Sequence, residues 1–165
     1  SYYSEGQMTG CAATRGKGMF LEAARTWRME RAEAQENFAM GIICAQQVFA
    51  HFSGAFGLQP EEAMRTAACF GSGMGQAATC GCVTGALMVL GLAHGCAGPC
   101  SRERKRNLYS RRDAFITAFA GSHGGLLCRE ILGYDLTIPE ERTHIREKDR
   151  FTTVWAPLVC VGLRA

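Results

Sequence analysis

Residues 38–56 read FAMGIICAQQVFAHFSGAF and show the clearest helical periodicity in the chain. Apolar side chains recur there at intervals of 4, 3, 4, 3 and 4 positions, which places them on one face of a helix. They are Phe38, Ile42, Ala45, Phe49, Phe52 and Phe56. The stretch predicts a single helix of roughly five turns, which Gly57 ends.

Further helices are predicted on both sides of that stretch. Upstream, residues 19–36 are rich in Ala, Glu and Arg and contain neither Pro nor Gly. Downstream, Pro60 is suited to the first turn of the next helix. Residues 81–92 are apolar all round, as in a buried central helix, and Gly81 and Gly85 would let a neighbouring helix approach closely. Helices are also predicted over residues 102–119 and 128–132 and from Pro139 onward.

Glycine-rich segments are expected to interrupt the helices at residues 71–75 and 121–125. No segment alternates apolar and polar residues for long enough to indicate a strand. The sequence therefore predicts an all-α fold, a compact single-domain bundle of about five to seven helices. We expect residues 1–18 to form an irregular N-terminal arm and residues 19–165 to form the helical, cysteine-containing domain.

The composition is that of an ordinary globular protein apart from its cysteines. The chain has 165 residues, of which 47% are hydrophobic and 20% charged, enough for one domain. Its longest apolar run, residues 83–93, is shorter than the roughly 20 residues that cross a membrane. The net charge of +3 is too small to indicate nucleic-acid binding. Residues 1–5 do not resemble a signal peptide, so we expect a cytoplasmic protein that binds neither membranes nor nucleic acid.

The 9 cysteines are the unusual feature of this composition. A free cysteine often packs as a small apolar residue, and we expect that role for Cys11 and Cys69. Cys80 and Cys128, in contrast, each follow a glycine-rich segment and precede a helix. Backbone N–H groups and the helix dipole lower the pKa of a thiol at that place. A thiolate is the form that redox exchange and metal binding both require.

The spacing of the cysteines does not match a standard motif. The chain contains neither a C-x-x-C pair nor a ferredoxin-like run of cysteines. Cys80 and Cys82 would point about 200° apart on a helix, so they can share one ion only if Cys80 still belongs to the loop. His94, Cys96 and Cys100 are a candidate second metal site in a loop.

The sequence resembles a family of redox-active proteins named for a C…GCAxxG…C…C cysteine pattern. The resemblance rests on residues 44–48 (CAQQV), 70–75 (FGSGMG), 79–92 (TCGCVTGALMVLGL) and 128–136 (CREILGYDL). Members of this family are small helical proteins, chiefly of anaerobic bacteria and archaea. A related domain occurs in a multihaem-type cytochrome that also carries an iron–sulfur cluster. The resemblance therefore implies redox chemistry without defining the reaction.

The resemblance assigns the family cysteines to Cys44, Cys80 and Cys128. The fourth family cysteine usually precedes a proline, and the corresponding pair in this chain is Ala156-Pro157. Cys160 lies one helical turn further on and is one candidate to replace it. Cys82, at a position where the family commonly has a small residue, is the other candidate. A three-cysteine core is therefore the firmest expectation, completed by Cys160 or Cys82.

Our leading hypothesis is an iron–sulfur protein that transfers electrons to a redox partner protein, with Cys44, Cys80, Cys128 and Cys160 or Cys82 as ligands. The second hypothesis is thiol–disulfide exchange, in which Cys80 attacks and Cys44 or Cys128 resolves the mixed disulfide. A structural zinc site is its metal variant, with His94 or His123 as a possible fourth ligand. The cofactor would accordingly be an iron–sulfur cluster, zinc or none.

The third hypothesis is a non-catalytic helical subunit of a larger redox complex, or a homo-oligomer. Its docking surfaces would be Tyr2-Tyr3 and the basic stretch from Arg102 to Arg112, although such a stretch is more often a solvated helix face. The sequence does not indicate whether the protein is an enzyme.

Overall fold

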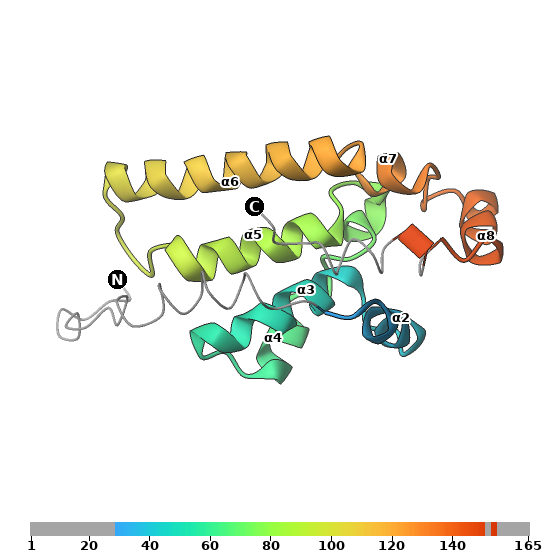
Figure 1. The fold of residues 1–165 in the computed structure, drawn as a ribbon, viewed down its shortest axis with the longest axis horizontal. Helices are drawn as coiled ribbons and strands as arrows, with labels where there is room; N and C mark the ends of the chain where they lie inside the picture. Colours follow the sequence, from blue (N-terminus) through green and yellow to red (C-terminus); the bar gives the residue numbers. More distant parts are fainter. Residues whose placement is uncertain (1–28, 151–152, 155–165) are drawn as a thin grey trace, which may run out of the picture.

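A computed structural model of the chain describes residues 29–150 and 153–154. This part of the chain is all-α, as predicted, and contains no strand apart from one isolated bridge. Figure 1 shows the arrangement of the helices. The α-helices are α2 (Arg31–Ala39), α3 (Cys44–Ser53), α4 (Pro60–Thr66), α5 (Gly81–His94), α6 (Arg102–His123), α7 (Cys128–Leu132) and α8 (Pro139–Glu147), with short helices η1 (Gly54–Phe56) and η2 (Gly73–Ala77).

Helix α5 is the centre of the fold, because α3 packs on one side of it and the long α6 runs antiparallel along the other (Figure 1). The predicted close approach at Gly81 and Gly85 is confirmed. A Cβ atom on Gly85 would lie 3.0 Å from the Ala45 carbonyl oxygen and 3.0 Å from the Val48 Cβ atom of α3. Small residues on α5 therefore allow the backbones of α3 and α5 to meet.

The single helix predicted over residues 38–56 is wrong at its start. The chain turns at Gly41, which has a left-handed φ of +84°, so α2 ends at Ala39 and α3 begins only at Cys44. Phe49 and Phe52 on α3 are buried in the core as the periodicity predicted, whereas Phe38 packs against the core from α2. The apolar spacing continued across the turn and concealed it.

Other predicted boundaries are confirmed. Gly57 follows η1 with a φ of +83°, and Pro60 is the first residue of α4. At the other end of the chain, α6 runs through Gly121 and ends at Gly124, which has a φ of +79°. The break predicted at residues 121–125 therefore begins three residues early, because Gly121 continues the helix and Gly124, with its left-handed φ, caps it.

Parts of the expected organisation lie outside the described residues. The predicted arm, residues 1–18, and the first part of the helix predicted from Met19 are not among the described residues. The division of the chain into an arm and a single domain therefore stays a prediction. In the part that the structure describes, no helix combines the length and the apolar character needed to cross a membrane.

Candidate functional site

Four cysteines lie where three helices begin. Cys44 is the first residue of α3, and Cys128 is the first residue of α7. Cys80 is the N-cap of α5, with non-helical angles of φ −57° and ψ 138°, and Cys82 follows in the first turn. Backbone N–H groups at such positions have no partner within their own helix. We refer to Cys44, Cys80, Cys82 and Cys128 as the four-cysteine cluster.

A short stretch of paired backbone joins the starts of α5 and α7. The Cys80 N–H donates to the Leu126 carbonyl at 2.8 Å, and the Cys128 N–H donates to the Ala78 carbonyl at 2.7 Å. The two bonds flank the isolated antiparallel bridge of this fold. Figure 1 accordingly shows α7 beside the segment that leads into α5. This pairing brings together two cysteines that are 48 positions apart in the chain.

Glu130 fixes the start of α7 from within the helix. Its Oε2 atom accepts hydrogen bonds from the N–H groups of Leu126 and Leu127, each at 3.1 Å. Gly125 has a φ of +156°, and a side chain there would overlap the Glu130 carboxylate. The glycine before α7 and the glutamate within it together set the position of Cys128.

The glycine-rich segment before α5 has an unusual backbone. Ser72, Met74 and Ala77 have left-handed φ angles of 54°, 57° and 49°. Each such residue costs of the order of 1–3 kcal/mol, and strain of this kind is concentrated at functional sites. The Ser72 N–H donates a hydrogen bond to the Cys44 sulfur. The strained backbone therefore contacts the four-cysteine cluster through Ser72.

Hydrogen bonds among the thiols centre on Cys80. The pKa of Cys80 is lowered far below its usual value, first by a hydrogen bond from Cys128 and then by those from Cys44 and Cys82. Conversely, the bond to Cys80 is the main reason why the pKa of Cys128 is raised, and it helps to raise the pKa of Cys44 to about 12. The pKa of Cys82 is raised mainly by its bond to Cys44. These hydrogen bonds thus favour negative charge on Cys80 over the three neighbouring thiols.

Backbone N–H groups also point at the sulfur atoms. The Cys80 sulfur accepts from the Cys82 N–H, and the Cys128 sulfur accepts from the Gly81 N–H. With the bond from Ser72 to Cys44, three sulfur atoms of the cluster have a main-chain donor. Such donors stabilise negative charge on sulfur and tune the potential of a metal–thiolate centre.

All four cysteines of the cluster have an exposed fraction of 0%. A partner protein therefore cannot reach these sulfur atoms without opening of the surrounding structure. Electrons can reach a buried centre, whereas a mixed disulfide with a partner needs direct contact between sulfur atoms.

The structure places the sequence-predicted residues as follows. The family cysteines Cys44, Cys80 and Cys128 lie together, and Cys82 lies with them because Cys80 is outside the helical turn that would otherwise separate the two side chains. Cys160 and Cys11 lie outside the described residues. Sequence reasoning did not single out Ser72, whose contribution is a backbone N–H group and leaves no signal in residue type.

The remaining candidates lie apart from the cluster or at its edge. His123 is close enough for the charge of Cys80 to raise its pKa, although burial has the larger effect and lowers it. His94 ends α5, about 20 Å along the helix from the cluster. Cys69 is exposed, so the expected packing role for it is wrong. Cys96 and Cys100, which with His94 were a candidate second metal site, instead form a disulfide.

The donor set of the cluster suits a metal that prefers sulfur, because four thiol groups face one another and three of them have N–H donors. The thiols hydrogen-bond to each other in this arrangement. Among residues 29–150 and 153–154, no group of three or more His, Cys, Asp or Glu side chains is arranged as a metal site. Metal–thiolate bonds would take the place of the thiol–thiol hydrogen bonds.

Comparison with protein-family models matches residues 42–163 to the family described as "Putative redox-active protein (C_GCAxxG_C_C)". The chain belongs to this family. The match includes every member of the four-cysteine cluster and confirms the resemblance recognised in the sequence. Comparisons with curated proteins and with solved structures gave no match.

Proposed function

We propose that this member of the redox-active family is an electron-transfer protein in which Cys44, Cys80, Cys82 and Cys128 hold an iron–sulfur cluster. The observation that supports the proposal is the meeting of four fully buried sulfur atoms from three helix starts. Four cysteine thiolates are the common ligand set of [2Fe–2S] and [4Fe–4S] clusters. When bound, the cluster would supply a one-electron couple.

The residues around the sulfur atoms suit this role. N–H donors from Ser72, Gly81 and Cys82 would stabilise the added negative charge of the reduced cluster. The apolar side chains of Val48 and Val83, each 1% exposed, exclude water from the neighbouring core. Both features favour reversible electron transfer over exchange of ligands with solvent. A redox partner protein would then donate or accept the electron.

Iron analysis of anaerobically purified protein tests the proposal. We expect stoichiometric iron and acid-labile sulfide, a visible charge-transfer absorption, and an electron paramagnetic resonance signal in one oxidation state. Cys44→Ser, Cys80→Ser, Cys82→Ser and Cys128→Ser should each lower the iron content. Cys69→Ser is the matched control, because Cys69 is exposed and free, and it should retain the iron of the wild type.

A comparison of Cys82→Ser with Cys160→Ser decides the fourth ligand. Loss of iron in Cys82→Ser with retention in Cys160→Ser supports the ligand set proposed above. The reverse result assigns the fourth position to Cys160 and contradicts the role of Cys82. Colourless, iron-free protein from a strictly anaerobic preparation would overturn the iron–sulfur proposal itself.

The contact between Cys80 and Cys128 favours a second candidate function, a dithiol–disulfide couple within the cluster. Oxidation of these two thiols to a disulfide would release two electrons and two protons. A Cys80 thiolate that accepts hydrogen bonds from its neighbours is suited to start such a reaction. Protein without metal that loses two cluster thiols on mild oxidation, and regains them on reduction, would support this candidate; bound zinc would instead indicate a structural site.

A further inference from the structure

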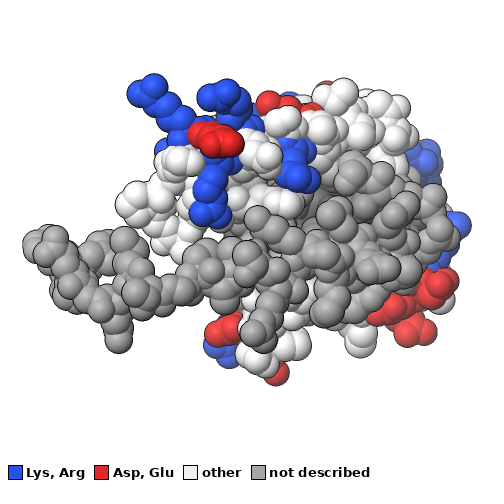
Figure 2. All heavy atoms as spheres, turned by 60° about the vertical axis from the view of Figure 1, so that its left-hand side comes forward, with Lys and Arg blue, Asp and Glu red and all other residues white. Residues whose placement is uncertain are grey.

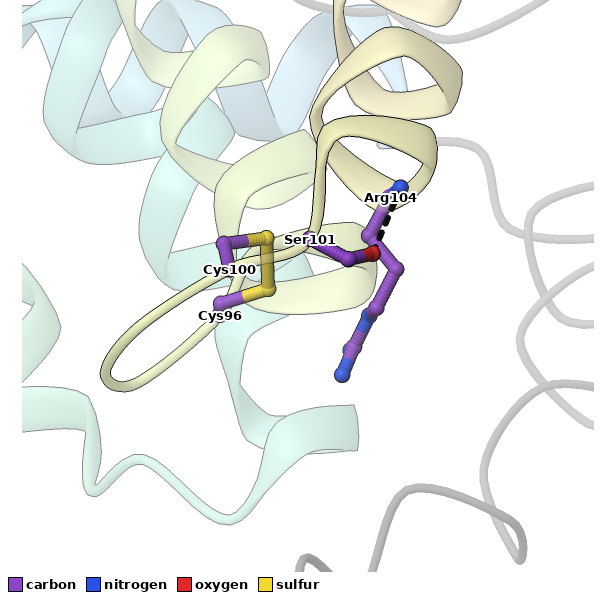
Figure 3. The surroundings of a disulfide bond; sticks show 4 residues. All are labelled: Cys96, Cys100, Ser101 and Arg104. Atoms are coloured by element: carbon purple, nitrogen blue, oxygen red, sulfur yellow. Dashed lines mark hydrogen bonds between the residues drawn. A yellow bond between two sulfur atoms is a disulfide. The ribbon is translucent and has the colours of Figure 1, made fainter.

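The disulfide between Cys96 and Cys100 lies at the surface, in the loop between α5 and α6. The Cα atoms of the two cysteines are 5.7 Å apart, within the usual range for a disulfide. Both residues are partly exposed, and Ala97, Gly98 and Pro99 between them are exposed. Figure 3 shows the two sulfur atoms joined across this small loop, next to Ser101 at the start of α6.

This disulfide is separate from the four-cysteine cluster. The cluster lies at the first residues of α5, whereas the loop follows its last residue, His94. The 14 residues of α5 span about 20 Å, so the two groups of sulfur atoms cannot exchange directly. A function of the disulfide must therefore involve a molecule that comes from outside.

We propose that Cys96–Cys100 is a second redox site, which exchanges with an acidic dithiol protein docked on the start of α6. One thiolate of the partner attacks the Cys96 sulfur, which forms a mixed disulfide and releases Cys100 as a thiolate. The second thiol of the partner then attacks the mixed disulfide and releases Cys96. The partner becomes a disulfide, and Cys96 and Cys100 gain two electrons and two protons.

The direction of attack follows from the position of Cys100 beside a long helix. Ser101 is the N-cap of α6, and its side-chain oxygen accepts from the Arg104 N–H at 3.2 Å (Figure 3). Cys100 is therefore one residue from the positive end of a 22-residue helix. That position stabilises a thiolate, and a more stable thiolate is the better leaving group. The Cys96 sulfur, at the end of the loop that follows α5, is therefore the one that forms the mixed disulfide.

The chemistry of the partner follows from the charge around this loop. Arg102, Arg104, Lys105 and Arg106 on the first turns of α6 are all exposed, and Glu103 is the one acidic residue among them. Figure 2 shows Lys and Arg side chains gathered on one region of the surface. A basic surface of this kind attracts an acidic protein and accelerates its association.

Reduction by two dithiol peptides of opposite charge tests the proposal on the full chain. Both peptides contain Cys-Gly-Pro-Cys, flanked by glutamates in one and by lysines in the other. Alkylation of the free thiols, followed by mass spectrometry of the proteolytic fragment that contains Cys96 and Cys100, measures the rate at which the disulfide is reduced. We expect the glutamate peptide to reduce the disulfide at least about tenfold faster at low salt, and the difference to shrink in 1 M salt.

Charge-reversal variants separate the docking surface from net charge. Arg104→Glu with Lys105→Glu should abolish the preference for the glutamate peptide. Arg31→Glu with Arg146→Glu, which reverses two exposed charges on α2 and α8, should retain it. Equal rates for both peptides with the wild type, or equal loss of preference in both double variants, would overturn the acidic-partner assignment.

A trapping experiment tests the direction of attack. A peptide with its second cysteine replaced by serine stops the reaction at the mixed disulfide, which we expect at Cys96 with Cys100 free for alkylation. A mixed disulfide at Cys100 would contradict the assignment. A disulfide that resists both peptides until the protein is unfolded would show that the bond is structural only and overturn the proposal. These outcomes do not depend on iron content, so they are independent of the iron–sulfur proposal.

Discussion

Gly81 leaves the space that the Cys44 thiol occupies. A Cβ atom at position 81 would overlap the Cys44 sulfur and lie 2.9 Å from the Ala45 backbone nitrogen. The contact connects the start of α5 with the start of α3. A residue without a side chain is therefore part of the four-cysteine cluster, because it determines how closely the other helix can approach.

Gly81→Ala should therefore destabilise the protein and disturb the cluster. Overpacking at such a contact costs about 1–3 kcal/mol of the free energy of unfolding. Gly91→Ala is the matched control in the same helix, because a Cβ atom at position 91 would meet nothing within 4 Å. Gly91→Ala should raise the free energy of unfolding by roughly 0.5–1 kcal/mol, because alanine has a higher helix propensity than glycine. Urea denaturation measures both; equal effects of the two variants would contradict the close approach at Gly81.

Removal of the Glu130 carboxylate should loosen the start of α7. Glu130→Ala leaves the Leu126 and Leu127 N–H groups without their acceptor, at an expected cost of about 1 kcal/mol. Glu140→Ala, at an exposed position in the first turn of α8, is the control. Amide hydrogen exchange at Leu126 and Leu127 should become faster in Glu130→Ala alone. Unchanged exchange there would show that the carboxylate does not hold this turn.

Thiol labelling of the native, metal-free protein should proceed in a defined order. Cys69 is exposed and should react with iodoacetamide first among the described free cysteines. The four-cysteine cluster, with exposed fractions of 0%, should react only as fast as the structure opens. Mass spectrometry of the labelled peptides gives the order. Rapid labelling of Cys80 under native conditions would show that the cluster is open to solvent and would favour exchange chemistry over a buried metal centre.

The free energy of unfolding should fall between pH 7 and pH 5, partly because of His51. Burial lowers the pKa of His51, and the charge of Glu33 offsets this only in part. The unfolded chain therefore binds a proton near pH 6.5, whereas the folded chain does so only at lower pH. Protonation favours the unfolded chain as the pH falls through this window. His51→Gln should show a shallower loss of stability by urea denaturation at pH 7, 6 and 5; the same slope as the wild type would contradict this assignment.

Much of the helical framework could be predicted from residue type. Gly57 and Pro60 punctuate the chain where glycine tolerates a left-handed φ and proline fits a first helical turn. The small residues at 81 and 85 predicted a close helix contact, which α3 provides. The break at Gly41 was missed because the apolar period continued across it, and periodicity does not report the φ of a single residue.

The residues of the candidate site could be predicted only in part from the sequence. Cys44, Cys80 and Cys128 could be chosen from the family pattern and from their places beside glycine-rich segments and helices. The sequence left Cys82 and Cys160 as alternatives. The position of Cys80 at the N-cap decides that Cys82 joins the cluster, since two residues inside one helix would point apart. The sequence made Cys96 and Cys100 candidate metal ligands, whereas the short distance between their Cα atoms allows a disulfide.

By itself, the sequence determined that the protein is helical, that its cysteines are the candidate functional groups and that it belongs with redox-active proteins. These properties follow from local propensity, from composition and from short motifs. Only the tertiary structure decided which sulfur atoms meet. That outcome depends on the bridge between the starts of α5 and α7 and on the approach of α3 to Gly81. Backbone hydrogen bonds between distant segments create the first contact, and close packing at a glycine creates the second. Neither pairing can be read from the order of residue types, because both depend on which segments meet in space.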